Sequence, residues 1–196
     1  MAIPIIYEDD WILIADKPSG LLTVPTPKNE SRTLTSILNL YPCHRLDRDT
    51  SGLIIYAKSK VVQKKMMEAF KLRRVKKTYI AFVRGLPKIE GSIHNRIDGI
   101  SAQTSYKVIE KRKEFAIVEV KPQTGRTNQI RIHFKAIGHP VLGETKFAFR
   151  RDFRVKAKRL CLHAERLEFN HPVSGKALSL ESDLPEDLKD FLRKND

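Results

Sequence analysis

The chain has little cysteine, no long apolar run and no basic leader. Its two cysteines, Cys43 and Cys161, fit neither a Cys-x-x-Cys pair nor a zinc-ribbon spacing, and such sparse cysteine is typical of a reducing compartment. No stretch approaches the ~18 apolar residues of a membrane span. The first ten residues contain Glu8, Asp9 and Asp10 but no basic residue, unlike a signal peptide. We therefore expect a cytoplasmic protein with no membrane contact.

The common cofactor and metal motifs are also missing. The sequence has no Gly-x-Gly-x-x-Gly, no His-Glu-x-x-His and no complete phosphate-binding loop, because Gly175-Lys176 is followed by Ala177 and lacks the earlier glycine. His44 and His163 lie near the two cysteines, but so scattered a set is unlike a zinc site. We expect no metal and no cofactor, so that any chemistry depends on side chains alone.

The 196 residues suit one domain, residues 1–196, which is long enough to bury roughly 70% of its unfolded surface. Short β-rich runs dominate, and the apolar stripe of Lys58 to Leu72 predicts a surface helix. The fold class expected is α+β, a mainly antiparallel mixed sheet with flanking helices. Strands are predicted at Ile3–Tyr7, Trp11–Ala15, Thr78–Val83, Thr104–Glu110, Phe115–Lys121 and Leu160–Phe169, and further helices at Thr33–Leu40, from Thr127 to Gly138 and at Pro185–Leu192.

Basic residues outnumber acidic ones by 37 to 23, which gives a net charge of +14. The excess gathers in two places. The first basic segment, Lys58–Lys77, has nine Lys or Arg against Glu68 alone, and the second basic segment, Lys146–Arg159, has seven against Asp152 alone. Such segments are typical of a surface that follows nucleic-acid phosphates, although a generic solvated face would look alike.

Two polar clusters are dense enough to carry chemistry. In His44-Arg45-Leu46-Asp47-Arg48-Asp49-Thr50-Ser51-Gly52-Leu53, one carboxylate stands between two arginines just before an apolar strand. Alone, this cluster is as typical of a charged turn as of an active site. The second cluster, Thr124 to His133, puts Arg131 beside the apolar stripe of a helix, where it could orient a partly buried carboxylate or form an ordinary helix-start ion pair.

These clusters resemble the motifs of the RluA family of pseudouridine synthases. His44 to Leu53 is similar to that family's HRLDxxTSG, Thr124 to His133 to its TGRTHQIRxH, Asp16 to Gly20 to its DKPxG, and Lys77 to Ala81 to its KxYxA. Gly138–Gly143 and Arg159–Ala164 also resemble family segments. The matches run in order from about residue 5 to 175. No S4-type RNA-binding segment precedes Ile3, so we expect a stand-alone pseudouridine synthase catalytic fold.

The resemblance implies that the protein isomerises a specific uridine to pseudouridine in structured RNA, in an rRNA or tRNA stem-loop, after the base has flipped out. It implies Asp47 as the catalytic carboxylate, Arg131 as the partner of Asp47, and Tyr79 as the residue that stacks on the base and could move a proton. Whether Asp47 adds to the sugar, adds to the base or assists loss of a 2′ proton stays open. A monomer is expected.

Four further residues are implied to bind the substrate. Arg45 is expected to fill the space of the flipped base, and Leu160 to line the uracil pocket or to belong to the core. Lys17 is expected either to contact RNA or to support the entrance loop. Asn128 stands where the family usually has His, and Gln123 and Glu144 also depart from the common pattern. Asn128 keeps hydrogen-bonding capacity but cannot ionise.

Two alternative functions make different predictions for this sequence. A non-catalytic RNA-binding or ribosome-assembly factor with the same fold is expected to have lost Asp47, Tyr79 or Arg131, and all three are present. A carboxylate-dependent hydrolase would need a second placed acid or metal ligands, which the sequence does not offer.

Overall fold

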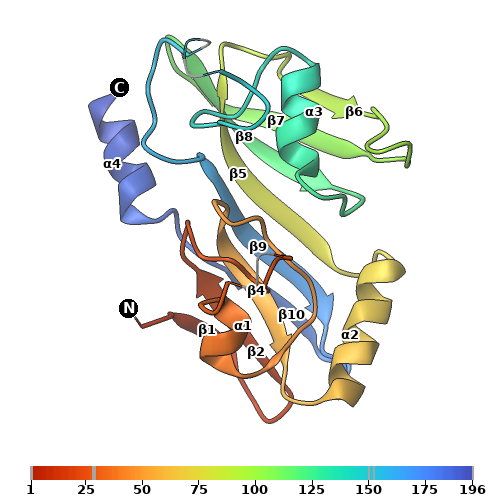
Figure 1. Cartoon of the computed structure of the whole chain (residues 1–196). Helices are drawn as coiled ribbons and strands as arrows, with labels where there is room; N and C mark the ends of the chain where they lie inside the picture. The colour runs from red at the N-terminus through yellow and green to blue at the C-terminus, as the bar shows by residue number, and fades with distance from the viewer. Residues whose placement is uncertain (1, 28–29, 150, 152, 196) are drawn as a thin grey trace. The chain divides into compact units, whose positions relative to one another are not determined.

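The chain forms two compact units in the computed structural model, which describes residues 2–27, 30–149, 151 and 153–195 (Figure 1). The first unit comprises Met1–Lys77 and Ala164–Ser182, and the second comprises Thr78–His163 and Asp183–Asp196. Each unit has a hydrophobic core of its own. Whether residues 1–196 behave as one domain stays a prediction.

The first unit is a sheet with two helices. The strand order is β1 (Ile5–Glu8), β2 (Ile12–Lys17), β4 (Ser51–Ala57) and β9 (Leu162–Asn170), with β10 (Ala177–Glu181) paired to β9 and the short β3 (Tyr41–Pro42) to β4. The pairs β1–β2, β2–β4, β3–β4 and β9–β10 are antiparallel. Helix α1 (Leu34–Leu38) begins after its capping residue Thr33, as predicted. Helix α2 (Lys60–Lys71) buries Val62 and Met66 and directs its lysine-rich side to solvent.

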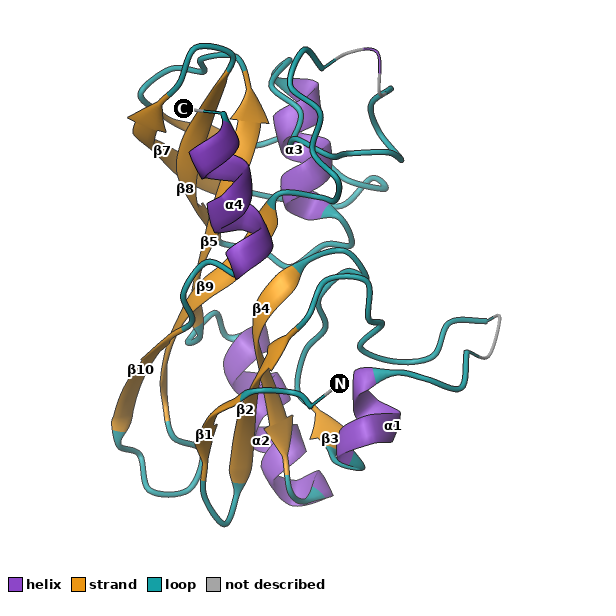
Figure 2. Cartoon of the chain, turned by 90° about the vertical axis from the view of Figure 1, so that its left-hand side faces the viewer, coloured by secondary structure: helices purple, strands orange, loops and turns teal. Residues whose placement is uncertain are grey.

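The second unit is a four-stranded antiparallel sheet between two helices. Its order is β5 (Lys76–Arg84), β8 (Phe115–Pro122), β7 (Thr104–Lys111) and β6 (Glu90–Ile93). Helix α3 (Gln129–Ala136) packs on one face, where Phe134 meets Tyr106, and α4 (Glu186–Lys194) packs on the other, where Phe191 stacks on Phe82 (Figure 2). In register, Tyr79 pairs with Val120, which pairs with Tyr106. Paired residues share a face, so Tyr79 lies on the α3 face.

The predicted fold class, α+β with a mainly antiparallel sheet and flanking helices, is confirmed. All predicted strands and helices are present, with shifted bounds. Helix α3 begins at Gln129 rather than Thr127, because Asn128 adopts a left-handed backbone with φ of 55°. Strands β3, β6 and β10 were not predicted. None of the helices described is long and apolar enough to cross a membrane.

Candidate active site

The backbone around Asp47 is held on both sides in the first unit. Thr23 Oγ1 donates to the carbonyl of Leu46 at 3.0 Å and accepts the Leu46 N–H at 3.2 Å. On the other side, the Thr50 N–H donates to the carbonyl of Asp47 at 3.2 Å and closes a turn just before β4. The carboxylate of Asp47, itself partly buried, therefore stands on a loop whose direction is fixed.

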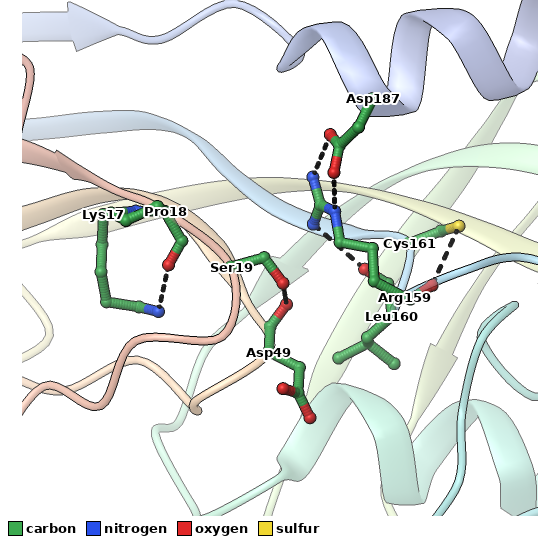
Figure 3. A network of polar contacts seen from close by, with 8 residues as sticks. All are labelled: Lys17, Pro18, Ser19, Asp49, Arg159, Leu160, Cys161 and Asp187. Carbon is green, nitrogen blue, oxygen red and sulfur yellow. Dashed lines mark hydrogen bonds and ion pairs between the residues drawn. The ribbon is translucent and has the colours of Figure 1, made fainter. Parts of the chain in front are cut away.

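The entrance loop holds the next two residues. The fully buried Lys17 donates its ammonium hydrogens to the carbonyls of Pro18 (2.9 Å), Leu21 (2.7 Å) and Arg48 (2.9 Å). Ser19 Oγ donates to the carbonyl of Asp49 at 2.8 Å (Figure 3). These contacts favour the supporting role among the two that the sequence allowed for Lys17, because a buried ammonium bonded to three carbonyls tightly couples the two loops.

Two neighbours of Asp47 differ sharply in environment. Arg45 is exposed, which suits a side chain that meets RNA. His44 lies against the Phe70 ring, with centroids 4.6 Å apart, and its Nε2 accepts the Ile55 N–H at 3.1 Å. Burial and the charge of Lys77 lower the pKa of His44 to about 3. His44 is therefore a neutral structural residue at physiological pH rather than an acid or base.

His44 should make the stability of the fold depend on pH. Its pKa rises from about 3 to the ordinary 6.5 on unfolding, so the unfolded state binds more protons between these values and stability falls as pH falls. Between pH 6.5 and 4.5 this amounts to about 2 kcal/mol. We expect His44→Gln to flatten the free energy of unfolding over that range, as measured by urea denaturation. A variant as steep as the wild type would contradict this.

Arg131 makes a buried, two-pronged ion pair in the second unit. Its Nε donates to Glu144 Oε2 at 2.7 Å and its Nη2 to Glu144 Oε1 at 2.8 Å. Glu144 Oε1 also accepts the N–H groups of Lys146 and Phe147. Burial pushes the pKa of Glu144 upward, but the hydrogen bonds and charge of Arg131 and these N–H groups outweigh it and leave the pKa below its usual value. The sequence did not predict this partner.

Asn128 also contacts the same guanidinium. Its Oδ1 accepts a hydrogen bond from Arg131 Nη1 at 2.8 Å, so two departures from the family pattern, Asn128 and Glu144, both orient Arg131. A guanidinium has five N–H donors, and these contacts engage three of them. The buried Gln129, which the sequence reasoning also missed, bonds Thr104 Oγ1 and the backbone at Gln103 and Arg126 and so fixes the start of α3. Arg131 is therefore presented in one orientation.

Tyr79 and Leu160 belong to the second unit as well. Tyr79 is partly buried on the same sheet face as α3. Leu160 lies in the core at 3% exposure, which favours a core role. The neighbouring Arg159 pairs with Asp187 of α4 through contacts of 2.6 and 2.8 Å (Figure 3).

The structure thus brings Tyr79, Arg131 and Asn128 to one face of the second unit. In the first unit it fixes Lys17 and the loop of Asp47, where Arg45 is exposed. The pairing of Asp47 with Arg131 stays a prediction. Burial raises the pKa of both Cys43 and Cys161 to about 12, so neither thiol is a nucleophile at neutral pH. Among the described residues, no three His, Cys, Asp or Glu side chains are grouped as metal ligands.

Known proteins resemble this chain along most of its length. Residues 11–136 match the RNA pseudouridylate synthase family. The dual-specificity RNA pseudouridine synthase RluA of Escherichia coli K12 is 38% identical over 91% of this chain and 91% of that protein. The ribosomal large subunit pseudouridine synthase D of Nitrosomonas europaea is 35% identical over 98% of this chain but only 65% of its own length.

A solved structure gives the same fold. Human RNA pseudouridylate synthase domain containing 4 superposes with a TM-score of 0.83 over 97% of this chain and 92% of that one, at 23% identity. The family match over residues 11–136 and the relative at 38% identity over 91% of the chain both identify the same family. The chain belongs to the RNA pseudouridylate synthase family.

Proposed function

We propose that this protein converts uridine to pseudouridine in structured RNA, with Asp47 as the catalytic carboxylate. The observation that carries the proposal is the fixing of the Asp47 loop through the backbone of Leu46, Arg48 and Asp49, inside the segment that matches the family. Such rigidity is what a reacting carboxylate requires, since small displacements of a reacting group reduce rate steeply.

The chemistry balances without a redox partner. The N1–C1′ bond of uridine breaks, the uracil turns, C5 bonds to C1′, C5 loses its proton, and N1 gains one. Asp47 supplies the carboxylate that adds to the sugar or base or assists proton loss. Arg131, held by Glu144, keeps that carboxylate ionised. Tyr79 stacks on the base, and Arg45 fills the place that the flipped base leaves.

The first basic segment offers a place for RNA phosphates. On the first unit, a groove of about 1000 Å³ is lined by Lys64, Lys65 and Arg74 together with the apolar Val61 and other residues of α2 and the end of β9. None of these three cations has an ion-pair partner among the described residues, whereas Lys58 pairs with Glu8. The groove thus has the charge and the unpaired cations of a phosphate-binding surface.

Neutralising this groove should weaken RNA binding and reduce its salt dependence. For the triple variant Lys64→Gln, Lys65→Gln and Arg74→Gln, we expect the slope of log affinity against log salt to shrink by up to about 2 to 3, since each phosphate contact contributes roughly 0.7 to 0.9. Fluorescence anisotropy with labelled RNA at several salt concentrations measures the slope.

The control removes the same charge elsewhere. Lys189, Arg193 and Lys194 lie on α4, and the first two pair with acidic neighbours. Changing these three to Gln should leave the slope nearly unchanged. If the two triple variants reduced the salt slope equally, the first basic segment would be an ordinary solvated face rather than a phosphate-binding surface.

The substrate is proposed to be rRNA or tRNA. The similar proteins are named as a dual-specificity RNA pseudouridine synthase and a ribosomal large subunit pseudouridine synthase, and the second name supports rRNA. The test is release of tritium from RNA labelled at uridine C5, followed by mapping of pseudouridine in RNA from cells lacking the protein. Absence of release from both RNAs would refute the proposal. A monomeric state, a cytoplasmic location and the lack of a cofactor remain predictions.

A further inference from the structure

The second basic segment begins with two phenylalanines in opposite environments. Phe147 is partly buried, with the Arg131 guanidinium 5.3 Å and the Lys146 ammonium 5.2 Å from its ring centroid. Ala148 is buried at 6% exposure, while 67% of Phe149 is exposed. The Arg151 guanidinium lies 4.9 Å from the Phe149 ring centroid. A phenylalanine so exposed, with a cation on it, is unusual because burying the ring would stabilise the fold by roughly 1.5–3 kcal/mol.

The start of this segment is tied to Arg131. Glu144 Oε1 accepts the Lys146 N–H at 2.7 Å and the Phe147 N–H at 3.2 Å, and the same carboxylate holds Arg131. Phe149 follows two residues after this anchor. The side chain that points outward is therefore carried by a segment fixed to the residue expected to orient Asp47.

The charges around Phe149 indicate the kind of partner. The ionisable residues described in this segment are all basic, namely Lys146, Arg151, Arg154, Lys156, Lys158 and Arg159. Arg154 and Arg159 pair with Glu114 and Asp187, and Arg150 and Asp152 lie outside the described residues. An apolar protein partner would have to desolvate these cations. A single-stranded nucleic acid instead brings phosphates for the cations and a flat base for the ring.

We propose that Phe149 stacks on an unpaired base of the bound RNA close to the target uridine, while the neighbouring cations meet phosphates. The inference rests on the proposed function, because it takes RNA as the substrate. Aromatic side chains that stack on splayed bases are a general means of binding single-stranded RNA. Phe149 is thus assigned to binding rather than to the chemical step.

The test compares substitutions at Phe149 in binding to a fluorescein-labelled 12-nucleotide oligouridine. Loss of one stacked base reduces affinity by about 5- to 150-fold, so we expect that loss for Phe149→Ala. Phe149→Leu keeps an apolar side chain of similar size but has no π face, and it should bind as weakly as Phe149→Ala. Phe149→Trp should bind at least as tightly as the wild type. The salt slope should stay unchanged in all three, because no cation is removed.

Ile109→Ala is the matched control, since Ile109 of β7 is an apolar residue of the same unit with 53% exposure. It should bind like the wild type. The inference would be overturned if Phe149→Ala or Phe149→Leu bound the oligouridine with wild-type affinity, or if Ile109→Ala lost as much affinity as they do. Tritium release by the wild type is assayed in parallel, so failure of the proposed function is seen separately from failure of the stacking contact.

Discussion

Replacing Asp47 with alanine is expected to abolish release of tritium from RNA labelled at uridine C5, with a loss of at least about a thousandfold. The loop that carries Asp47 is fixed through main-chain contacts of Leu46, Arg48 and Asp49. None of these contacts uses the Asp47 side chain. The variant keeps these main-chain contacts, so we expect it to fold and to bind RNA, while the carboxylate proposed to act on the sugar or base is lost.

The nearest control is the other carboxylate of the same turn. Asp49 accepts the Ser19 hydroxyl through its main-chain oxygen, so Asp49→Ala removes an equal charge two residues away and leaves that bond in place. It should keep most of the activity. Activity in Asp47→Ala, or loss in Asp49→Ala alone, would transfer the catalytic role away from Asp47. Asp47→Asn, which keeps the size of the side chain, should be as inactive as the alanine variant.

Much of the fold was predictable because the relevant signals are local. Thr33 caps α1 as predicted, and the buried stripe of α2 contains Val62 and Met66. Strand β6 has only four residues, too few to show an alternation of apolar and polar side chains. It contains Gly91, whose missing side chain leaves room for the Tyr106 ring. Strand β10 does alternate, but it is a half-exposed strand whose formation depends on pairing with β9. Local patterns do not encode that pairing.

The environment of Arg131 was not predictable for a similar reason. Arg131 was expected to contact a carboxylate, and the resemblance to the family motif implied that this carboxylate is Asp47. The structure adds Glu144, thirteen residues away and beyond the end of α3. That contact depends on the path of the chain after Gly138, which no periodicity specifies. Asn128, expected as a departure of uncertain effect, proves to bond Arg131 and to adopt the left-handed backbone that Asn tolerates.

Gly52→Ala should destabilise the first unit severely. Gly52 begins the pairing of β4 with β2, just after the Asp47 turn, and has a φ of 113°. An added Cβ would lie 2.3 Å from the carbonyl oxygen and 2.6 Å from the amide nitrogen of Ala164. The clash is with backbone of β9, so no side chain can rotate away. Strain in φ and overpacking together cost about 2 to 6 kcal/mol, a large part of the roughly 5–15 kcal/mol that stabilises a domain.

Urea denaturation and the yield of folded protein measure this loss, and Gly175→Ala is the matched control. Gly175 also has a positive φ, 72°, but nothing lies within 4 Å of its added Cβ. That variant pays only the backbone strain of roughly 1–2 kcal/mol. If the two alanine variants had equal free energies of unfolding, the conclusion that β4 packs closely against Ala164 would be wrong. If only Gly52→Ala loses its stability, the glycine after Ser51 is required by the packing of two strands, and the motif around Asp47 combines the proposed catalytic carboxylate with a structural requirement five residues later.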